Sequence, residues 1–308
     1  MMKIAERLIR AAKSPNLFGR GVNRLYHRRF NRRRFNTDGV DVFEEDWDNL
    51  LILDACRYDM FANHHELPGR LESRISRGAA TVEFLRGNFV DRSLEDTVYV
   101  TANPQFYRNR DRLPTDLHDV INIWRTDGWD DEYQTVLPET VNEYALEAID
   151  RYPHKRLVVH YIQPHYPFLG SETSFDKNHL NLEQPDEERV WDQLMTGRLN
   201  VDRDVLWQLY VDNLLHALPH AEALMTALSG KTVVTADHGN MLGERASPVP
   251  IKEWGHPRGI YTKQLVKVPW LVYDEGPRRS VVAEQTDDAH EAVDEDIVTE
   301  RLEDLGYR

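Results

Sequence analysis

Short apolar segments that alternate with stretches of helical periodicity constrain the fold of this chain more than any other feature. The apolar segments lie within 49–61, 96–104, 156–168, 231–240 and 266–273. Between the third and fourth of them, apolar side chains recur at helical intervals over 185–229. Strands that alternate with helices predict an α/β fold with a mainly parallel central sheet and helices on both faces.

The charge of the chain is divided unevenly between its first residues and the remainder. Residues 1–35 hold eleven Lys and Arg against the single acid Glu6, a formal charge of +10, whereas the whole chain carries −14. The remainder is therefore strongly acidic, at −24. So acidic a body excludes nucleic acid as a partner across its general surface. Heavy use of Asp and Glu with little Lys also indicates a halophilic protein from a high-salt cytoplasm.

These patterns predict three regions along the chain. Residues 1–39 form a basic arm, 40–278 form the α/β domain, and 279–308 form an acidic segment that ends in a helix. In the arm, one side of a predicted amphipathic helix carries Ile4, Leu8, Ile9 and Ala12, and a Pro/Gly break and a second basic stretch follow.

The arm has the pattern of a helix that lies on an anionic membrane surface, where each basic residue adds about 1 kcal/mol. We therefore expect residues 1–35 to contact such a membrane peripherally. A solvated arm, or a helix packed on the acidic body, explains the same pattern, and both alternatives stay open.

Three absences define the expected location. No run of about 18 apolar residues is present, so no transmembrane helix is expected, and the basic N-terminus lacks an apolar core of signal-peptide length. Cys56 is the single cysteine, which excludes an intramolecular disulfide and a cysteine-built zinc site and fits a reducing compartment. We therefore expect a cytoplasmic protein, with peripheral contact at the inner membrane surface.

Polar side chains with metal-binding chemistry close three of the expected strands. Asp54 ends the first, Asp237 and His238 end the fourth, and His160 and His165 lie within or just after the third. The carboxyl ends of parallel strands share one edge of a sheet, so these side chains can converge. Two aspartates and an imidazole supply enough ligands for a divalent ion, with one position left for a nucleophile or water. No local motif such as HExxH is present, so the prediction depends on the topology.

Four segments, in the same order, resemble the alkaline phosphatase superfamily and, within it, the sulfatase-like branch. They are LLILDACRYD, QPHYPF, TVVTADHGNMLGE and WGH…KVPWLVY, and the resemblance covers roughly residues 48–275. It implies an alkaline-phosphatase-like fold for residues 40–278, as a sulfatase-like catalytic domain. It also implies that Asp54, Asp237 and His238 hold one divalent metal ion, which is Mn, Mg, Ca or Zn.

The resemblance further implies a nucleophile and two histidines near the substrate. The nucleophile falls within SRGAATVEFLRGNF, and AATVEF is similar to the nucleophile segment of lipoteichoic acid synthases. Thr81 is therefore the expected nucleophile and a further metal ligand, with Ser76 as the alternative. His165 takes the place of the substrate-side histidine, and His256 stands where sulfatases carry a basic residue near the sulfuryl group. Gly239 is expected to keep side-chain atoms away from the ion.

The chain also departs from the pattern of these families. The Cys/Ser-x-Pro-Ser-Arg motif of type I sulfatases is absent, and Cys56 is interpreted as a small buried hydrophobe. Asp54 stands alone where sulfatases carry a double Asp, with Asp59 either a supporting partner or a surface residue. His216 lies on a helix with the pattern of a structural element, and His220 is assigned to the surface, so one ion is favoured over two.

The function predicted on these grounds is that of a metal-dependent hydrolase or transferase. Its substrate is a phosphate or sulfate ester attacked by a threonine, with glycan-linked and lipid-linked esters among the candidates. The alternative from another class is a catalytically degenerate member of the family that acts as a membrane-associated binding or scaffold protein. The presence of Asp54, Thr81, Asp237 and His238 together favours the enzyme.

Overall fold

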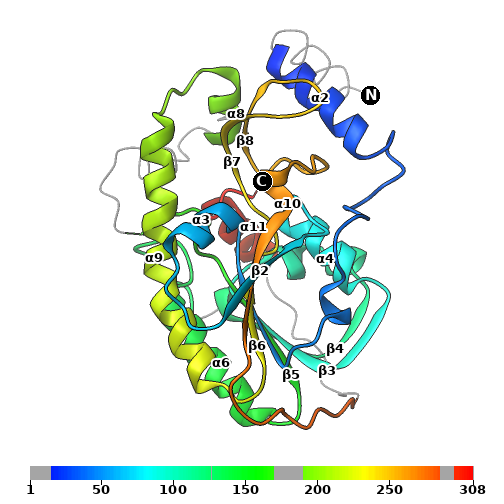
Figure 1. The fold of residues 1–308 in the computed structure, drawn as a ribbon, viewed down its shortest axis with the longest axis vertical. Coiled ribbons are helices and arrows are strands. Elements are labelled where there is room, and N and C mark those ends of the chain that lie inside the picture. The colour runs from blue at the N-terminus through cyan, green and yellow to red at the C-terminus, as the bar shows by residue number, and fades with distance from the viewer. Residues whose placement is uncertain (1–14, 126, 170–189, 285–294, 308) are drawn as a thin grey trace.

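The computed structural model describes residues 15–125, 127–169, 190–284 and 295–307, and a seven-stranded sheet lies at its centre (Figure 1). In spatial order the strands are β2 (Arg70–Ile75), β9 (Lys267–Tyr273), β6 (Thr232–Thr235), β1 (Asn49–Leu53), β5 (Arg156–Tyr161), β3 (Arg92–Thr101) and β4 (Thr115–Asn122). From β6 to β4 every neighbouring pair is parallel, whereas β9 pairs antiparallel with both β6 and β2. The predicted α/β fold with a mainly parallel sheet is confirmed.

The two edge strands, β2 and β4, are not predicted by the sequence pattern. β2 reads RLESRI, and none of its residues is fully buried. β4 reads TDLHDVIN, and only one of its residues is fully buried. An edge strand pairs on one side only and tolerates charged side chains there, so a search for apolar runs misses it.

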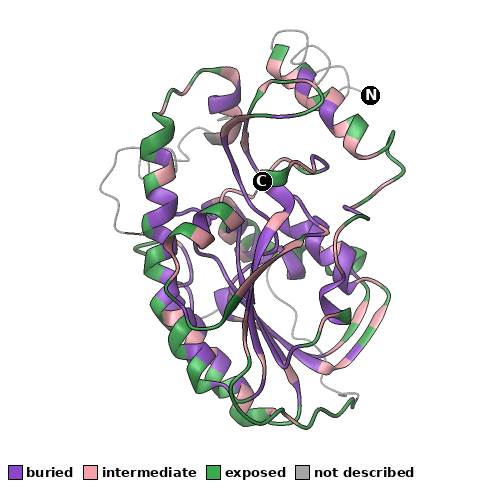
Figure 2. Ribbon diagram, in the orientation of Figure 1, coloured by how far each residue is buried: buried purple, intermediate pink, exposed green. Residues whose placement is uncertain are grey.

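Helices cover both faces of the sheet, as predicted. Successive residues of β1 point to opposite faces, so that Leu51 and Leu53 join one hydrophobic cluster while Leu50 and Ile52 join the other. The first cluster includes residues of α6 (Pro138–Arg151), α9 (Arg203–Ala227) and α11 (Glu295–Asp304) among its helices, and the second includes residues of α4 (Thr81–Phe89) and α5 (Gln105–Arg108). Figure 2 shows the resulting buried centre. A strand buried on both faces needs a continuous apolar sequence, which explains the run NLLIL.

The remaining elements connect these layers or lie beside them. They are η1 (Val42–Glu44), α3 (Tyr58–His64), η2 (Arg110–Arg112), η3 (Ile123–Arg125), α8 (Val190–Thr196), the antiparallel pair β7 (Met241–Arg245) and β8 (Lys252–Gly255), and α10 (Lys263–Val266). Within the described residues, no helix is both long and apolar enough to cross a membrane.

The helical region predicted over 185–229 is divided into two helices, α8 and α9. Gly197 follows α8 with a φ of 74°, a conformation that ends a helix readily at glycine. The Asp202 side chain then caps α9 by accepting from the N–H of Asp204. Residues 185–189 of the predicted region lie outside the described residues.

The basic arm is packed on the body from Pro15 onward, where α2 (Pro15–His27) begins. The predicted Pro/Gly break does not interrupt the chain from Pro15 to Gly21, which lie within α2, because proline is tolerated in the first turn of a helix. Gly19 faces the body, where a Cβ would lie 2.7 Å from the side chain of Ile251. Arg20 pairs with the buried Glu253 at 2.5 Å. The helix predicted over the first twelve residues lies outside the described residues.

Candidate functional site

The carboxyl ends of three neighbouring strands, β1, β5 and β6, form the base of the candidate site. Ile52 of β1 is level with His160 of β5 and with Thr235 of β6, so the residues that follow emerge side by side. Asp54 and Asp237 are brought together in this way, and both are completely buried, as is His160. The register of the sheet therefore collects groups that are far apart in the sequence.

A strained turn directly after β1 orients the two aspartates. Ala55 has a φ of 58°, in the left-handed region that costs a non-glycine residue roughly 1–2 kcal/mol. In this conformation the Ala55 N–H donates to Oδ1 of Asp237 at 3.1 Å, and the N–H of His238 donates to the same oxygen at 2.8 Å. Oδ1 of Asp237 is thereby fixed, and its Oδ2 is left 3.3 Å from Nε2 of His238.

His238 presents a defined nitrogen to the two aspartates. Its Nδ1 lies 2.8 Å from the Gly239 carbonyl, which can only accept, so in the neutral ring Nδ1 carries the proton and Nε2 has a free lone pair. This Nε2 lies 3.6 Å from Oδ1 of Asp54. An imidazole whose other nitrogen donates to a carbonyl is the form in which histidine binds metals.

Thr81 begins α4 and reaches the same cluster. Its Oγ1 lies 3.3 Å from Nε2 of His238 and 3.5 Å from the Tyr307 hydroxyl. Ser76, the alternative nucleophile, is also buried, but its hydroxyl donates to the backbone carbonyl of Asp237. The structure therefore places Thr81 among the polar side chains and directs Ser76 to the backbone.

Two residues that the sequence pattern does not identify hold Asp54. Asn103 follows β3 and donates to Oδ2 of Asp54 at 2.6 Å, and the hydroxyl of Tyr307 donates to the same oxygen at 2.6 Å. Asn103 stands just beyond a strand end, like the predicted ligands, and that position could have identified it. Tyr307 follows α11 and is brought in by tertiary packing, so no local pattern indicates it.

His165 and His256 meet through their Nε2 atoms, which lie 3.1 Å apart. Burial lowers the pKa of His165 to about 4, and its Nδ1 donates to the Tyr166 carbonyl at 2.7 Å, so Nε2 of the neutral His165 accepts from His256. The His256 ring stacks on His238 with centroids 4.8 Å apart, and the Tyr307 ring stacks on His165 at the same separation. These four rings link both predicted substrate-side histidines to the aspartate cluster.

His160 also belongs to the cluster: the strand-end pattern placed it among the groups expected to converge, but the resemblance did not assign it as a ligand. Its Nε2 lies 3.9 Å from Oδ2 of Asp54 and 3.9 Å from Oδ2 of Asp237. Burial lowers the pKa of His160 to about 4, and its Nδ1 lies 2.7 Å from the Tyr99 hydroxyl. The Tyr99 hydroxyl thus contacts Nδ1 of the neutral His160 ring, and Nε2 of that ring points at both carboxylates.

The donor atoms of this cluster fit a divalent metal ion. Burial and repulsion from Asp237 raise the pKa of Asp54 well above its usual value, because the two carboxylates lie side by side away from water. Oδ1 of Asp54, Oδ2 of Asp237 and Nε2 of His160 are buried with no hydrogen-bond partner among the described residues. Buried polar atoms are normally paired, and carboxylate oxygens with imidazole nitrogens are ligands of divalent ions.

Three other features predicted for the site lie outside the cluster or have a different cause. Asp59 pairs with Arg57 at 2.7 Å and its side chain is 53% exposed, which is a surface position. Cys56 is buried in the apolar core, as predicted. Gly239 allows a close approach to the backbone rather than to an ion, because a Cβ there would lie 2.1 Å from the Gln264 carbonyl oxygen.

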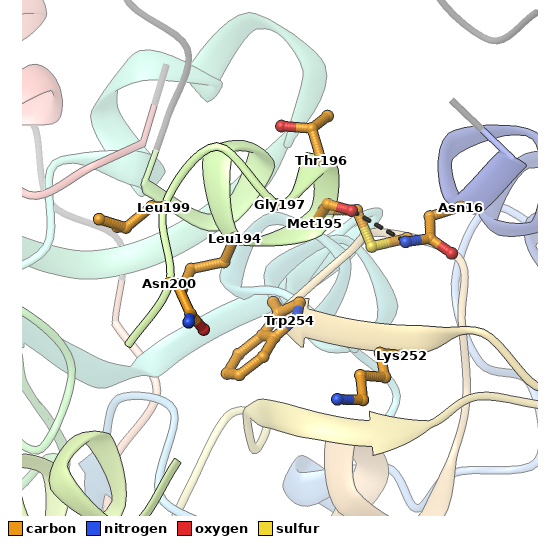
Figure 3. Close-up of a pocket in the computed structure, with 9 residues that line it drawn as sticks. All are labelled: Asn16, Leu194, Met195, Thr196, Gly197, Leu199, Asn200, Lys252 and Trp254. Carbon is orange, nitrogen blue, oxygen red and sulfur yellow. Dashed lines mark hydrogen bonds between the residues drawn. The ribbon is translucent and has the colours of Figure 1, made fainter. Parts of the chain in front are cut away.

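A separate hollow of about 350 Å³ lies near α2, α8 and β8 (Figure 3). Its lining consists of Asn16, Leu194, Met195, Thr196, Gly197, Leu199, Asn200, Lys252 and Trp254. At its edge the Asn16 side chain donates to the Met195 carbonyl. Among the described residues that line it, Lys252 is the only charged one, and no residue of the aspartate cluster is present. This hollow is therefore not the candidate metal site.

No protein-family model and no curated protein matches this chain. Among solved structures it is similar to the periplasmic domain of EcEptC from Escherichia coli in complex with Zn, at 14% identity and a TM-score of 0.46, over 73% of this chain and 72% of that one. It is similar to the phosphoethanolamine transferase EptC from Campylobacter jejuni at 13% identity and a TM-score of 0.44, over 74% and 78%. A phosphonate monoester hydrolase from Silicibacter pomeroyi follows at 15% and 0.32, over 76% and 69%.

The predicted cytoplasmic location is corrected by the same comparison, because the EptC structures are periplasmic domains.

The metal fit leads to a prediction for Asp237→Asn. Asparagine keeps the shape and the oxygen that accepts from Ala55, but it removes a charged ligand. We expect the affinity for Mn²⁺ or Zn²⁺ to fall by about 10–100-fold or more. The metal content of protein dialysed against buffered metal measures this in a His216→Ala, His220→Ala background, which lacks the histidines of a separate cluster. Asp59→Asn is the control that removes an exposed carboxylate. Tight binding of one ion at the cluster by Asp237→Asn would contradict the prediction.

Proposed function

We propose that this protein is a metal-dependent enzyme that hydrolyses or transfers a phosphate ester, with Thr81 as its nucleophile. The observation that carries the proposal is the convergence of Thr81 Oγ1, His238 Nε2 and the unpaired carboxylate oxygens of Asp54 and Asp237. A divalent ion held by Asp54, Asp237 and His238, with His160 beside it, would lower the pKa of the Thr81 hydroxyl and stabilise negative charge on the transferred group.

The position of Thr81 suits it to attack an ester. Its hydroxyl is buried at the first residue of α4, where the first N–H groups of a helix lack intrahelical partners and favour a negatively charged group. In the proposed reaction Oγ1 attacks phosphorus, the alcohol of the ester departs, and a phosphoryl-threonine forms. Water or an acceptor alcohol then takes the phosphoryl group and restores the hydroxyl of Thr81.

The paired histidines have roles on the substrate side of this reaction. The His256 Nε2–H is directed at His165. The His256 ring stacks on His238, and the His165 ring stacks on Tyr307. An ester oxygen that takes the place of His165 Nε2 would accept the hydrogen bond from His256 instead. His256 would thereby stabilise the transferred group or protonate the departing alcohol.

We also propose that the exposed face of α2 contacts an anionic lipid surface. Phe18, Leu25 and Tyr26 lie on this face at positions i, i+7 and i+8, and their exposed fractions are 64%, 39% and 61%. Phe30, 76% exposed, follows the helix and is surrounded in sequence by the exposed arginines Arg29, Arg32 and Arg34. Aromatic side chains beside arginines are typical of helices that lie on membranes.

Replacement of Thr81 tests the nucleophile. Thr81→Ala removes the attacking oxygen but leaves the aspartates and histidines, so we expect turnover of para-nitrophenyl phosphate to fall by about 10³-fold or more while the metal content stays near that of the wild type. Thr81→Ser keeps a hydroxyl and should retain much of the activity.

Ser76→Ala serves as the control for the alternative nucleophile, and para-nitrophenyl sulfate distinguishes the ester class. The assignment to Thr81 is wrong if Ser76→Ala abolishes turnover and Thr81→Ala does not. The phosphate-ester assignment is wrong if only the sulfate is hydrolysed. Absence of turnover in the wild type with either ester or a transfer acceptor would favour the non-enzymatic alternative.

Vesicles test the lipid-facing surface of α2. We expect the protein to sediment with vesicles that contain anionic lipid, and the binding to weaken as salt rises, since each basic residue near the surface adds about 1 kcal/mol. Phe18→Ser with Phe30→Ser should reduce the bound fraction. Val205→Ser, which removes an exposed apolar side chain of α9, is the matched control. Equal sedimentation of all three proteins would exclude this surface.

A further inference from the structure

A second cluster of metal-binding side chains lies on the outer surface of α6 and α9. It consists of Glu139 in the first turn of α6 and of His216 and His220 in α9. One ligand atom from each lies within 4.8 Å of the other two. None of the three belongs to the aspartate cluster, and Glu139 and His216 are exposed whereas Asp54 and Asp237 are completely buried.

The spacing of the two histidines places them on one side of α9. Residues four apart in a helix lie one above the other, and the rings of His216 and His220 have centroids 5.9 Å apart. Nε2 of His220 lies 3.7 Å from Oε2 of Glu139. This separation is too long for a hydrogen bond but within the span of two ligands that each lie about 2 Å from a zinc ion.

The two helices are held in register at this point. Asn142, one turn after Glu139 in α6, donates from its side chain to the backbone carbonyl of His220 at 2.8 Å. The same Asn142 accepts from the hydroxyl of Tyr161 at 2.6 Å, so α6 is fixed both to α9 and to strand β5. Figure 1 shows α6 and the lower part of α9 side by side. The two helices that carry the ligands are therefore joined to each other, and α6 is also joined to the sheet.

We propose that Glu139, His216 and His220 bind a Zn²⁺-class transition-metal ion and join α6 to α9. Two imidazole nitrogens and one carboxylate are a common donor set for such ions, with water at the remaining positions, whereas Mg²⁺ and Ca²⁺ prefer oxygen ligands. This proposal gives His216, predicted to lie on a structural helix, and His220, predicted to lie at the surface, a role as ligands of a shared ion.

Zinc titration of the full chain tests this site, in a background that lacks the buried one. Chelator-treated Asp237→Asn protein should bind one Zn²⁺ per chain more than the same protein with His216→Ala and His220→Ala, when measured by calorimetry. Zinc should also raise the melting temperature of the first protein and not that of the second, because an ion that binds only the folded state stabilises it.

His154→Ala in the same background is the control, since it removes an exposed histidine from outside the cluster. It should leave both the zinc stoichiometry and the zinc-dependent rise in melting temperature unchanged. Equal zinc binding with and without His216 and His220 would overturn the proposal. Loss of zinc binding in the His154→Ala protein would also overturn it, because the binding would then not be specific to the cluster.

An independent observation concerns Tyr307, and the inference from it rests on the proposed function. The hydroxyl of Tyr307 donates to Oδ2 of Asp54 at 2.6 Å and accepts from Asn103 at 3.1 Å, while its ring stacks on His165. Oδ2 of Asp54 is thereby occupied and Oδ1 is left unpaired beside His238.

The geometry points to Tyr307 as a positioning residue that directs one oxygen of Asp54 toward the metal ion. The C-terminal part of the described chain is well placed for this role, since Val298 and Leu302 of α11 and Leu305 after it are buried in the main core. Partners that orient a ligand typically affect metal affinity by about 10–100-fold.

Tyr307→Phe separates the hydroxyl from the ring. We expect its affinity for Mn²⁺ or Zn²⁺ at the buried site to fall by about 10–100-fold, measured by competition with a chromophoric chelator in a His216→Ala, His220→Ala background. Tyr133→Phe, which changes an exposed tyrosine, should bind the metal like the parent protein.

The outcomes distinguish this inference from the proposed function. If Asp237→Asn loses the metal and Tyr307→Phe binds it as tightly as the parent, the role of Tyr307 is wrong and the metal site stands. If neither change alters metal binding, both the site and the role of Tyr307 are wrong.

Discussion

The structure depends on the burial of two aspartates, Asp54 and Asp237, beside each other at the carboxyl edge of the sheet. Carboxylates at this depth repel one another, and their desolvation is expensive unless a cation or a proton compensates it. The surrounding backbone maintains the arrangement through the left-handed turn at Ala55 and through N–H donors to Oδ1 of Asp237. Strain and unpaired charge concentrated at one point are typical of functional sites.

Segments from distant parts of the chain complete this arrangement. α4 brings Thr81 beside His238, and the segment after α11 brings Tyr307 to Asp54. Two imidazoles, His165 and His256, connect Tyr307 with His238 through ring contacts. The aspartates alone could hold an ion, but Thr81 and His256, the proposed nucleophile and the proposed proton donor, join them only through these long-range contacts.

Within the basic arm, the two faces of α2 have different surroundings. On one side of α2, Gly19 and Asn23 are buried and Arg20 pairs with Glu253, which binds the helix to the acidic body. The other side leaves Phe18 and Leu25 in solvent. Packing on the body and the proposed contact with a lipid surface therefore concern opposite faces of α2.

The sequence by itself determined the central strands and the polar groups that end them, because both depend on local order: a run such as NLLIL must be buried, and Asp54 follows it directly. Tertiary structure alone placed the Thr81 hydroxyl beside His238 and directed the Ser76 hydroxyl to the backbone, although only a few residues separate the two in the sequence. It alone also brought Tyr307 to Asp54. Such contacts join segments that are far apart in the sequence, so no local periodic pattern indicates them. They form only when the helices pack on the sheet.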